Sequence, residues 1–516
     1  MFFRKSPRAL ENKIMSSAGP IVVKDMGMLY GQVYFIKVSA DAEDIAARPE
    51  YDSPAIIMPF DKAKEIMDLL DSEPDGRKTN NILNFLTSGN FLMARTDENA
   101  MHHYHLYARN LHRPVVYMKE ILQEMNRYFS GTNTRNLIKT IRFMVRDAVA
   151  KGLFNLEVIP ENLQMAFSNF DIFFDGTKEP LEKRVKNNLS AAFPLAAPFL
   201  YLSPFFMRLR MNYAAHSADF LHAQAPIILK ELHDYAEGGV PHSIITLSVI
   251  ELIKEEVDVY RTNIEALKTH LLTLSLESVF QYLKKPEIIS LLATLGATEN
   301  LTVIFESTLQ ALHSSPDLIE KLHAALKTLL GDLTFEVANL EQIKTLFDKD
   351  EAANGYLHRF YLESLRREDF KQSADTLRTG TMSLRYTNQN IKCGDYLIPK
   401  GSSIVFLPGV PRFDERLYPT PDTFDPDRYL LKMNQHLEKY PLTVFNEAKR
   451  RCPAAHVSSY ITKMFISHLV LHYDFNLQKA KEADKWPTLL QVAEKQGKEV
   501  VQEAMNLQPF TISMSG

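Results

Sequence analysis

Helical periodicity between residues 100 and 370 constrains the fold of this chain more than any other feature. The segments RPVVYMKEILQEMNRYF and NLIKTIRFMVRDAVAKGL place apolar residues three and four positions apart, the spacing that one buried helix face requires. One long helix is expected through PEIISLLATLGATENLTVIFESTLQALHSS, ending before Pro316, because a residue that precedes proline disfavours helical dihedrals. The next helix is expected to end on Gly331. The pattern therefore predicts a body made mainly of helices.

Strand-like patterns lie near the two ends of this helical region. Residues in GQVYFIKVSA alternate between β-branched or aromatic and other types, and SLRYTNQNIKCGDYLIPKGSSIVFLP predicts a hairpin with a turn at Pro399–Gly401 into another strand. No internal repeat, low-complexity tract or linker divides the chain. We therefore expect a single domain over residues 1–516, with a helical body at about 60–370 and 453–475 and a smaller β region at about 20–60 and 380–410.

Composition excludes several classes of protein. The 516 residues are 45% hydrophobic and 24% charged with a net charge of −4, which fits an ordinary globular protein and argues against a nucleic-acid binder. The N-terminal stretch MFFRKSPRALENKIM lacks an apolar run long enough for a signal peptide or a membrane span, so we expect a cytoplasmic or cytosol-facing chain. Residues 191–207 carry no charge, but three prolines prevent one straight spanning helix. They fit either a buried or loop segment, or an apolar surface that makes peripheral membrane contact.

The chain has two cysteines, too few for a disulfide framework. Cys452 follows three consecutive cations and precedes Pro453, which suits a first helical position. Nearby positive charge and a helix N-terminus both favour a thiolate. Taken alone, this pattern fits an inert half-buried thiol best. A nucleophile would need a histidine placed as its base, and a zinc site would need a second cysteine at ligand spacing, which the isolated Cys393 does not provide.

The surroundings of Cys452 resemble the haem-binding loop of the cytochrome P450 superfamily. The stretch FNEAKRRCPA fits the pattern Phe-x-x-Gly-x-Arg-x-Cys-x-Gly with alanine at both glycine positions. The resemblance implies that Cys452 is the axial thiolate ligand of haem iron, that Arg450 pairs with a haem propionate, and that Phe445 packs beside the sulfur. An alanine forced into a left-handed conformation costs about 1–2 kcal/mol, so Ala448 and Ala454 mark a divergent form of the loop.

Further features carry the same resemblance in the family's order. Glu363-x-x-Arg366 places both charges on one helix face, and GDYLIPKGSSIVF, PDTFDPDRYL and the cysteine loop follow it. The resemblance implies that Glu363, Arg366 and Arg428 form a buried charged triad that braces the segment before the cysteine. It also implies that Arg385, in SLRYTNQNI, binds a haem propionate from a strand.

The stretch HHYHLYARNLHRP resembles a helix in which the family keeps Trp-x-x-x-Arg. Here His105-x-x-x-Arg109 keeps the spacing and the arginine, and histidine replaces tryptophan. An imidazole N–H can still donate to a carboxylate, so the resemblance implies that both residues reach haem propionates. A metal cluster of the three close histidines is a weaker alternative, and His102 and His103 are expected at the surface.

The segment GATENLT resembles the family's oxygen-activation segment and implies catalytic roles for Glu299 and Asn300. Glu299 falls on the family's acid and can relay protons through water. Asn300 falls on its threonine, and its amide donates a hydrogen bond but does not titrate. Asparagine here is similar to the sterol 7α-hydroxylase and prostacyclin synthase branches, of which the second rearranges a peroxide without added electrons. The plainer alternative is a polar residue at a helix kink near Gly296.

The resemblance implies the cytochrome P450 fold, mainly α with a small β region, and a haem b (iron protoporphyrin IX) cofactor. The first hypothesis is a monooxygenase that oxidises an apolar small molecule, such as a lipid, sterol or terpenoid-like compound, with O2 and electrons from a separate reductase or ferredoxin. The second is a reductant-independent peroxide isomerase or dehydratase. The third is a degenerate member that binds haem or lipid without catalysis, which the departures at the two alanines, His105 and Asn300 keep open.

Overall fold

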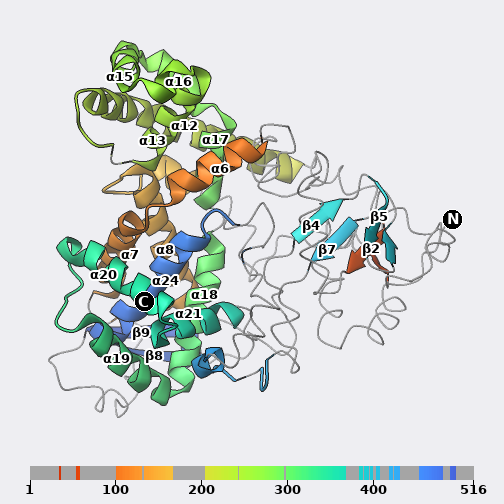
Figure 1. Ribbon diagram of the computed structural model, residues 1–516. Helices are drawn as coiled ribbons and strands as arrows, with labels where there is room; N and C mark the ends of the chain where they lie inside the picture. The colour runs from red at the N-terminus through yellow and green to blue at the C-terminus, as the bar shows by residue number, and fades with distance from the viewer. Residues whose placement is uncertain are drawn as a thin grey trace.

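The computed structural model describes residues 34–36, 54–57, 100–130, 133–166, 204–241, 243–295, 298–367, 383–386, 389–393, 396–398, 403–406, 418–421, 423–430, 445, 452–479 and 488–494. Its helices are α6 (Ala100–Leu111), α7 (Pro114–Phe129), α8 (Leu137–Phe154), α12 (Pro204–Ala236), α13 (Ile244–Glu256), α14 (Val259–Thr262), α15 (Ile264–Thr273), α16 (Leu276–Leu283), α17 (Pro286–Thr294), α18 (Thr298–Ser314), α19 (Pro316–Leu330), α20 (Leu340–Ala352), α21 (Tyr356–Arg366) and α24 (Ala455–His472) (Figure 1). Two short 3-10 turns are η5 (Val337–Asn339) and η6 (Pro426–Tyr429). The predicted mainly α fold is confirmed, whereas the predicted bounds of the helical body, which include residues 60–99 and 167–203 outside the described set, stay predictions.

The helix predicted as continuous through the GATENLT segment is two helices, α17 and α18, so that prediction was wrong. The buried hydroxyl of Thr298 donates to the backbone carbonyl of Leu295 at 2.6 Å. This bond joins the first residue of α18 to the residue that follows α17, and Gly296 and Ala297 between them lie outside the described residues. The predicted ends downstream are confirmed, since Pro316 begins α19 and Gly331 closes it with φ of 59°.

Four strands from the two ends of the helical region form one sheet in the order β1-β2-β7-β4. β1 (Tyr34–Ile36), β2 (Pro54–Ile57) and β7 (Ser403–Phe406) run parallel, whereas β4 (Ser383–Tyr386) is antiparallel to β7. The predicted hairpin is present as β5 (Ile391–Cys393) and β6 (Tyr396–Ile398). The predicted β region is therefore confirmed, and Figure 1 shows these strands on the side of the molecule opposite the helical body. A single domain over the whole chain stays a prediction.

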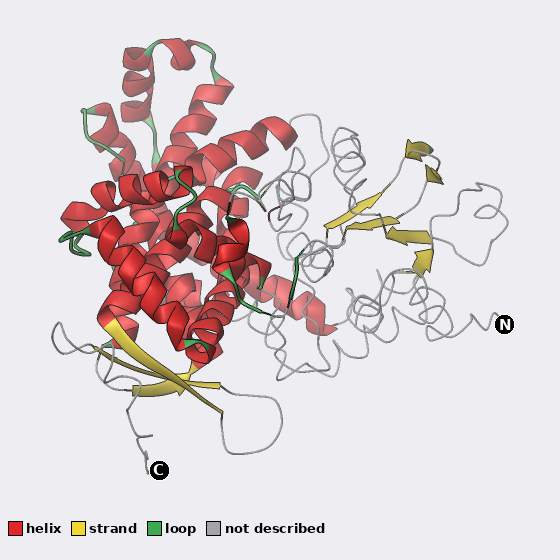
Figure 2. Cartoon of the chain, turned by 60° about the horizontal axis from the view of Figure 1, so that its bottom comes forward, coloured by secondary structure: helices red, strands yellow, loops and turns green. Residues whose placement is uncertain are grey.

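A second sheet, which the sequence did not predict, lies against the helical body. β8 (Tyr473–Lys479) continues directly from α24 and pairs with β9 (Thr488–Glu494), which also pairs with β3 (Asn133–Asn136). Figure 2 shows these strands crossing below the helices. The sheet therefore ties the C-terminal region to the segment between α7 and α8.

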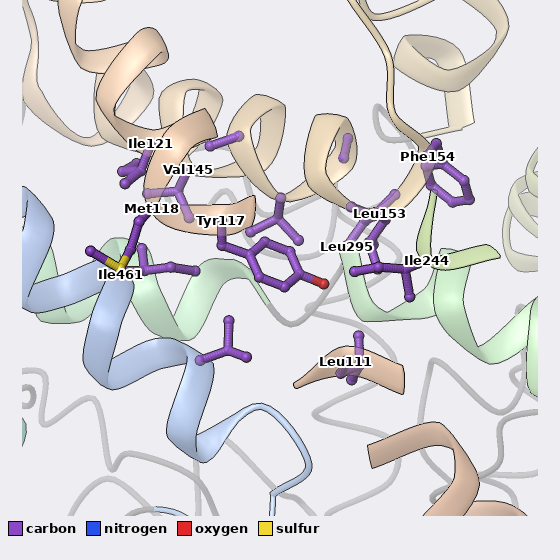
Figure 3. Close-up of a cluster of buried hydrophobic side chains, with 14 of the residues drawn as sticks. Leu111, Tyr117, Met118, Ile121, Val145, Leu153, Phe154, Ile244, Leu295 and Ile461 are labelled. Atoms are coloured by element: carbon purple, nitrogen blue, oxygen red, sulfur yellow. The ribbon is translucent and has the colours of Figure 1, made fainter. Parts of the chain in front are cut away.

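The hydrophobic core lies between α7, α8, α18 and α24 (Figure 3). Tyr117 and Met118 of α7 point into this cluster, together with Ile461 of α24. Phe305 of α18 stacks on Phe465 of α24, with ring centroids 3.9 Å apart and planes 9° apart. These contacts hold α24, and with it the cysteine that precedes the helix, against the centre of the body.

Among the described helices, none is both long and apolar enough to cross a bilayer. The uncharged stretch 191–207 lies outside the described residues as far as residue 203, and its last residues begin α12. Membrane contact through this stretch stays a prediction.

Gly355 occupies a position that has no room for a side chain. A Cβ atom there would lie 1.8 Å from Oδ1 of Asp350. That carboxylate accepts a 2.7 Å hydrogen bond from the backbone N–H of His358 and so satisfies an otherwise unpaired donor in the first turn of α21. We expect Gly355→Ala to displace the carboxylate and lower the free energy of unfolding by about 1–3 kcal/mol, measured by urea unfolding.

A double-mutant cycle tests the physical cause of this loss. In an Asp350→Ala background the clash no longer exists, so Gly355→Ala should cost much less. An equal cost in both backgrounds would show that the carboxylate is not what the new methyl group meets.

A buried histidine near the end of α24 should make stability depend on pH. His468 is 5% exposed, its Nε2 lies 2.8 Å from Oδ1 of Asn126, and the hydroxyl of Tyr473 donates to the same oxygen at 2.8 Å. Burial, together with the neighbouring His472 ring, lowers the pKa of His468 from 6.5 to about 3. The folded protein therefore keeps this ring neutral where the unfolded chain takes up a proton.

Between about pH 6.5 and pH 3 the unfolded state binds the extra proton, so His468 should destabilise the fold by about 1.4 kcal/mol per pH unit as the pH falls. A His468→Gln variant removes this titration. Urea unfolding at pH 7 and pH 5 should show the wild type losing about 2 kcal/mol more than the variant. Parallel losses in the two proteins would contradict the assignment.

Candidate functional site

Cys452 lies three residues before the first residue of α24, and its side chain is half-buried. Its backbone N–H donates to the carbonyl of Phe445 at 2.6 Å, and its carbonyl accepts from the N–H of Ala455 at 3.2 Å. The first bond closes the loop, and the second leads directly into the helix. The loop thus sets the thiol at a helix N-terminus, whose partial positive charge favours the thiolate form.

The two described neighbours in this loop have definite positions. Phe445 packs against the hydrophobic core of the helical body and thereby anchors the start of the loop. Ala454 caps α24 with φ of −89° and ψ of 5°, an ordinary conformation for any residue. Alanine at this glycine position therefore does not carry the left-handed strain that the sequence led us to expect. Ala448 and Arg450 lie outside the described residues.

The structure brings Glu363, Arg366 and Arg428 together in the interior. Glu363 and Arg366 are fully buried, and Arg428 is 4% exposed. Arg366 donates to both carboxylate oxygens of Glu363, from Nε at 2.8 Å and from Nη2 at 2.7 Å, and Nε of Arg428 donates to Oε1 at 3.1 Å. Burial alone would lower the pKa of Arg366, but the hydrogen bonds and charge of Glu363 outweigh it and raise that pKa.

The triad also holds the backbone that precedes the cysteine loop. Nη2 of Arg366 donates to the carbonyl of Thr423 at 3.1 Å, and Arg428 donates to the carbonyls of Thr423 and Pro419, each at 2.9 Å. Further N–H groups of Arg366 and Arg428 thus have backbone carbonyls as partners, which a buried cation requires in addition to its counter-charge. The three side chains therefore fasten residues 419–428 to α21.

Three residues that the sequence analysis did not single out extend this bracing. Asn354, at a positive φ of 49°, donates from its amide to the carbonyl of Tyr429 at 2.7 Å. Arg359 pairs with Asp427 at 3.0 Å, and Arg367 donates to the carbonyl of Pro421 at 3.0 Å. The partners of these three residues lie some 54 to 75 residues away in the chain. The charged stretches RREDF and HRFYLES therefore did not by themselves indicate these contacts.

The histidine-rich helix α6 faces α13 through polar contacts. Arg109 forms an ion pair with Glu251, and Nε2 of His102 lies 2.6 Å from Glu255. His105 is exposed, and its ring contacts the ring of Tyr104 edge-on at 5.7 Å. The structure thus gives Arg109 a carboxylate partner on α13. The haem-propionate roles of His105 and Arg109 stay predictions.

The oxygen-activation segment lies at the break between α17 and α18. Asn300 is exposed in the first turn of α18, whereas the side chain of Glu299 lies outside the described set. The hydroxyl of Thr302 donates to the carbonyl of Thr298 at 3.2 Å, and Thr298 itself bonds back to Leu295. Thr298 is therefore a residue that shapes this segment and that the motif alone did not identify.

Arg385 lies on β4 opposite Ile404, and its side chain is not among those described.

Among the described residues, the side chains that could bind a metal fit a haem-thiolate site. Within the described part of the chain, no three His, Cys, Asp or Glu side chains come together as a metal site, so no cluster with three or more such ligands is found there. What the loop offers is one half-exposed thiol at a helix N-terminus. A single axial thiolate is what an iron held by a porphyrin requires from the protein.

Comparison with known proteins gives one matching family model. Residues 245–499 match the model described as cytochrome P450. Ferruginol synthase from Salvia miltiorrhiza is 27% identical over 224 residues, which are 43% of this chain and 39% of that protein. The matched part thus spans about two fifths of the length of this relative.

Solved structures show the same fold over a larger part of the chain. Cyanobacterial CYP120A1 with bound retinoic acid has a TM-score of 0.58 at 15% identity, and the match covers 88% of this chain and 95% of that one. A zebra fish cytochrome P450 with abiraterone also has a TM-score of 0.58, at 13% identity, covering 95% of this chain and all of that one. At these identities the likeness concerns the fold.

Proposed function

The chain belongs to the cytochrome P450 superfamily, and on this premise we propose that it is a haem-thiolate monooxygenase that oxidises an apolar small molecule. The observation that carries the proposal is Cys452, held by its loop at the N-terminus of α24 and preceded in the chain by a segment that a buried charged triad fastens to α21. No group of three or more His, Cys, Asp or Glu side chains gathers as a metal site among the described residues. Electrons would come from a separate reductase or ferredoxin.

Haem b is the cofactor that this site fits. Bound there, it supplies the iron at which O2 is activated for insertion of one oxygen atom into the substrate. Cys452 would hold the iron through its sulfur and supply electron density to it, and the partial positive charge at the N-terminus of α24 favours the thiolate form that this role needs. Arg450, Arg385, Arg109 and His105 are the proposed partners of the two propionates.

Glu299 and Asn300 are the proposed distal residues. A carboxylate can take up and release protons through water, whereas an amide can only hold a water or substrate by hydrogen bonds. We expect Glu299→Gln to lower turnover by about 100-fold, the lower end of what a positioned proton-transfer group contributes. Steady-state turnover at constant haem content is the measurement, and unchanged turnover would remove Glu299 from the proton path.

The proposed substrate is an apolar molecule of the lipid, sterol or terpenoid type. The support is the name ferruginol synthase for one relative and the retinoic acid and abiraterone held by the two structural neighbours. All three names denote compounds with large hydrocarbon skeletons.

A second function rests on Asn300. A reductant-independent isomerase or dehydratase of the same fold would rearrange a lipid peroxide and would need no proton relay to oxygen. An exposed amide in the first turn of α18, in place of a threonine hydroxyl, favours this alternative. A protein that binds haem or lipid without catalysis is the third possibility.

One pair of assays separates these functions. The haem-loaded protein is incubated with a panel of sterols and terpenoids, isotopically labelled O2, NAD(P)H and a reductase, and in parallel with a lipid hydroperoxide and no reductant. We expect a product with one labelled oxygen atom that forms only when the reductase is present. Rearrangement of the hydroperoxide without reductant would overturn the monooxygenase proposal, and no product in either assay would favour a non-catalytic protein.

A further inference from the structure

Two exposed histidines meet on the surface beside the start of α24. His112 lies in the short connection between α6 and α7, and His456 is the second residue of α24, one helical turn after Cys452. Their ring centroids are 5.5 Å apart, and the ring planes are nearly perpendicular at 81°. Both side chains are exposed, and neither ring makes a hydrogen bond to any residue that the structure describes.

The separation of the rings matches that of two histidines bound to one metal ion. A zinc ion binds imidazole nitrogen at about 2.0–2.1 Å, which places two ring centres about 5–5.5 Å apart at a tetrahedral angle. Both side chains are exposed, so small rotations about their own bonds can aim one nitrogen of each at a common point. The two remaining positions of the ion would hold water.

Burial and nearby cations favour the neutral form of the His112 ring. Burial, followed by the charges of His456 and Lys344, lowers the pKa of His112, while Asp348 opposes the shift. Neutral imidazole is the form that binds a metal. The carboxylate of Asp348 already accepts from Lys344 at 2.7 Å and from the hydroxyl of Tyr460, so it adds negative charge nearby rather than a ligand.

We propose that His112 and His456 form a two-histidine site for a divalent transition-metal ion such as Zn2+, separate from the Cys452 site. Imidazole nitrogen suits zinc, copper and nickel, whereas the hard cations Mg2+ and Ca2+ prefer oxygen ligands. An ion held there links the α6–α7 connection to the first turn of α24. It therefore restrains the helix that follows the thiol, and metal occupancy stabilises that part of the fold.

The test is a Zn2+ titration of the haem-loaded protein by isothermal calorimetry, together with its thermal unfolding midpoint with and without Zn2+. We expect one Zn2+ per chain and a higher midpoint in its presence. His112→Ala and His456→Ala should each weaken binding by at least about ten-fold and remove the rise in the midpoint. His102→Ala, which removes another exposed histidine of α6, should leave both results unchanged.

Two outcomes would overturn the proposal. Equal Zn2+ binding in the wild type and in both variants would place the ion elsewhere on the surface. Zn2+ binding that appears only in haem-free protein and vanishes in Cys452→Ser would assign the ion to the thiol. Because both variants alter exposed side chains, we expect each to fold, and far-UV circular dichroism checks this before the titration.

Discussion

Glu363→Gln should lower the free energy of unfolding by about 3–5 kcal/mol, because it leaves two buried guanidinium groups without their counter-charge. The carboxylate is fully buried and accepts hydrogen bonds from Arg366, from Arg428 and from the backbone N–H of Asp425. Glutamine keeps the shape of the side chain but removes its charge. Since residues 419–428 depend on these bonds, the loss should also loosen the segment before the cysteine loop.

Urea unfolding of haem-loaded protein measures this loss, and Glu265→Gln is the matched control. Glu265 pairs with Lys268 at 3.2 Å on α15, and its side chain is 77% exposed. The same substitution there should cost less than about 1 kcal/mol, as expected of an exposed ion pair. A loss at Glu363 no larger than at Glu265 would contradict the account of the triad.

Cys452→Ser should abolish activity while leaving the protein folded. A serine hydroxyl fills nearly the same space but does not ionise near neutral pH, so the axial thiolate is lost. Removing a residue that only hydrogen-bonds to a metal ligand lowers metal affinity or activity by about 10- to 100-fold. We therefore expect removal of the ligand itself to lower turnover by more than about 100-fold. The urea midpoint of haem-free protein should change little, because the side chain is only half-buried and serine is close to cysteine in size.

Cys393→Ser is the control for this substitution, since it removes the chain's other cysteine from strand β5. It should retain the turnover and haem content of the wild type. Loss of activity in Cys393→Ser with retention in Cys452→Ser would reverse the assignment of the ligand.

Sequence patterns predicted the elements whose formation depends on residues that are neighbours in the chain. Apolar residues at helical spacing located the helices of the body, and Pro316 and Gly331 set the boundaries of α19 as expected. The strands predicted at both ends of the helical region meet in one sheet, although the sequence gave no information on their pairing. In the missed sheet, β8 and β9 pair with each other locally, but the pairing of β9 with β3, some 350 residues earlier, is non-local and has no signal in the sequence.

Some contacts of the candidate site could be predicted from the sequence and others could not, for the same reason. Glu363 and Arg366 share a helix face, so their contact follows from spacing, but the placement of Arg428 came only from the family resemblance. The division into α17, which ends at Thr294, and α18, which begins at Thr298, was not predicted, because apolar spacing does not report where one helix ends and the next begins. The strain expected at Ala454 is absent because the loop meets α24 there with a negative φ, a detail of backbone geometry that no residue pattern encodes.

The absorption spectrum of the purified, reduced and CO-bound protein tests the central claim most directly, because the band position reports the ligand opposite CO. With Cys452 bound to the iron, we predict the band typical of a haem-thiolate, present in the wild type and in Cys393→Ser and absent in Cys452→Ser. A wild-type spectrum with the band of a histidine-bound haem, or with no haem band at all, would contradict the account.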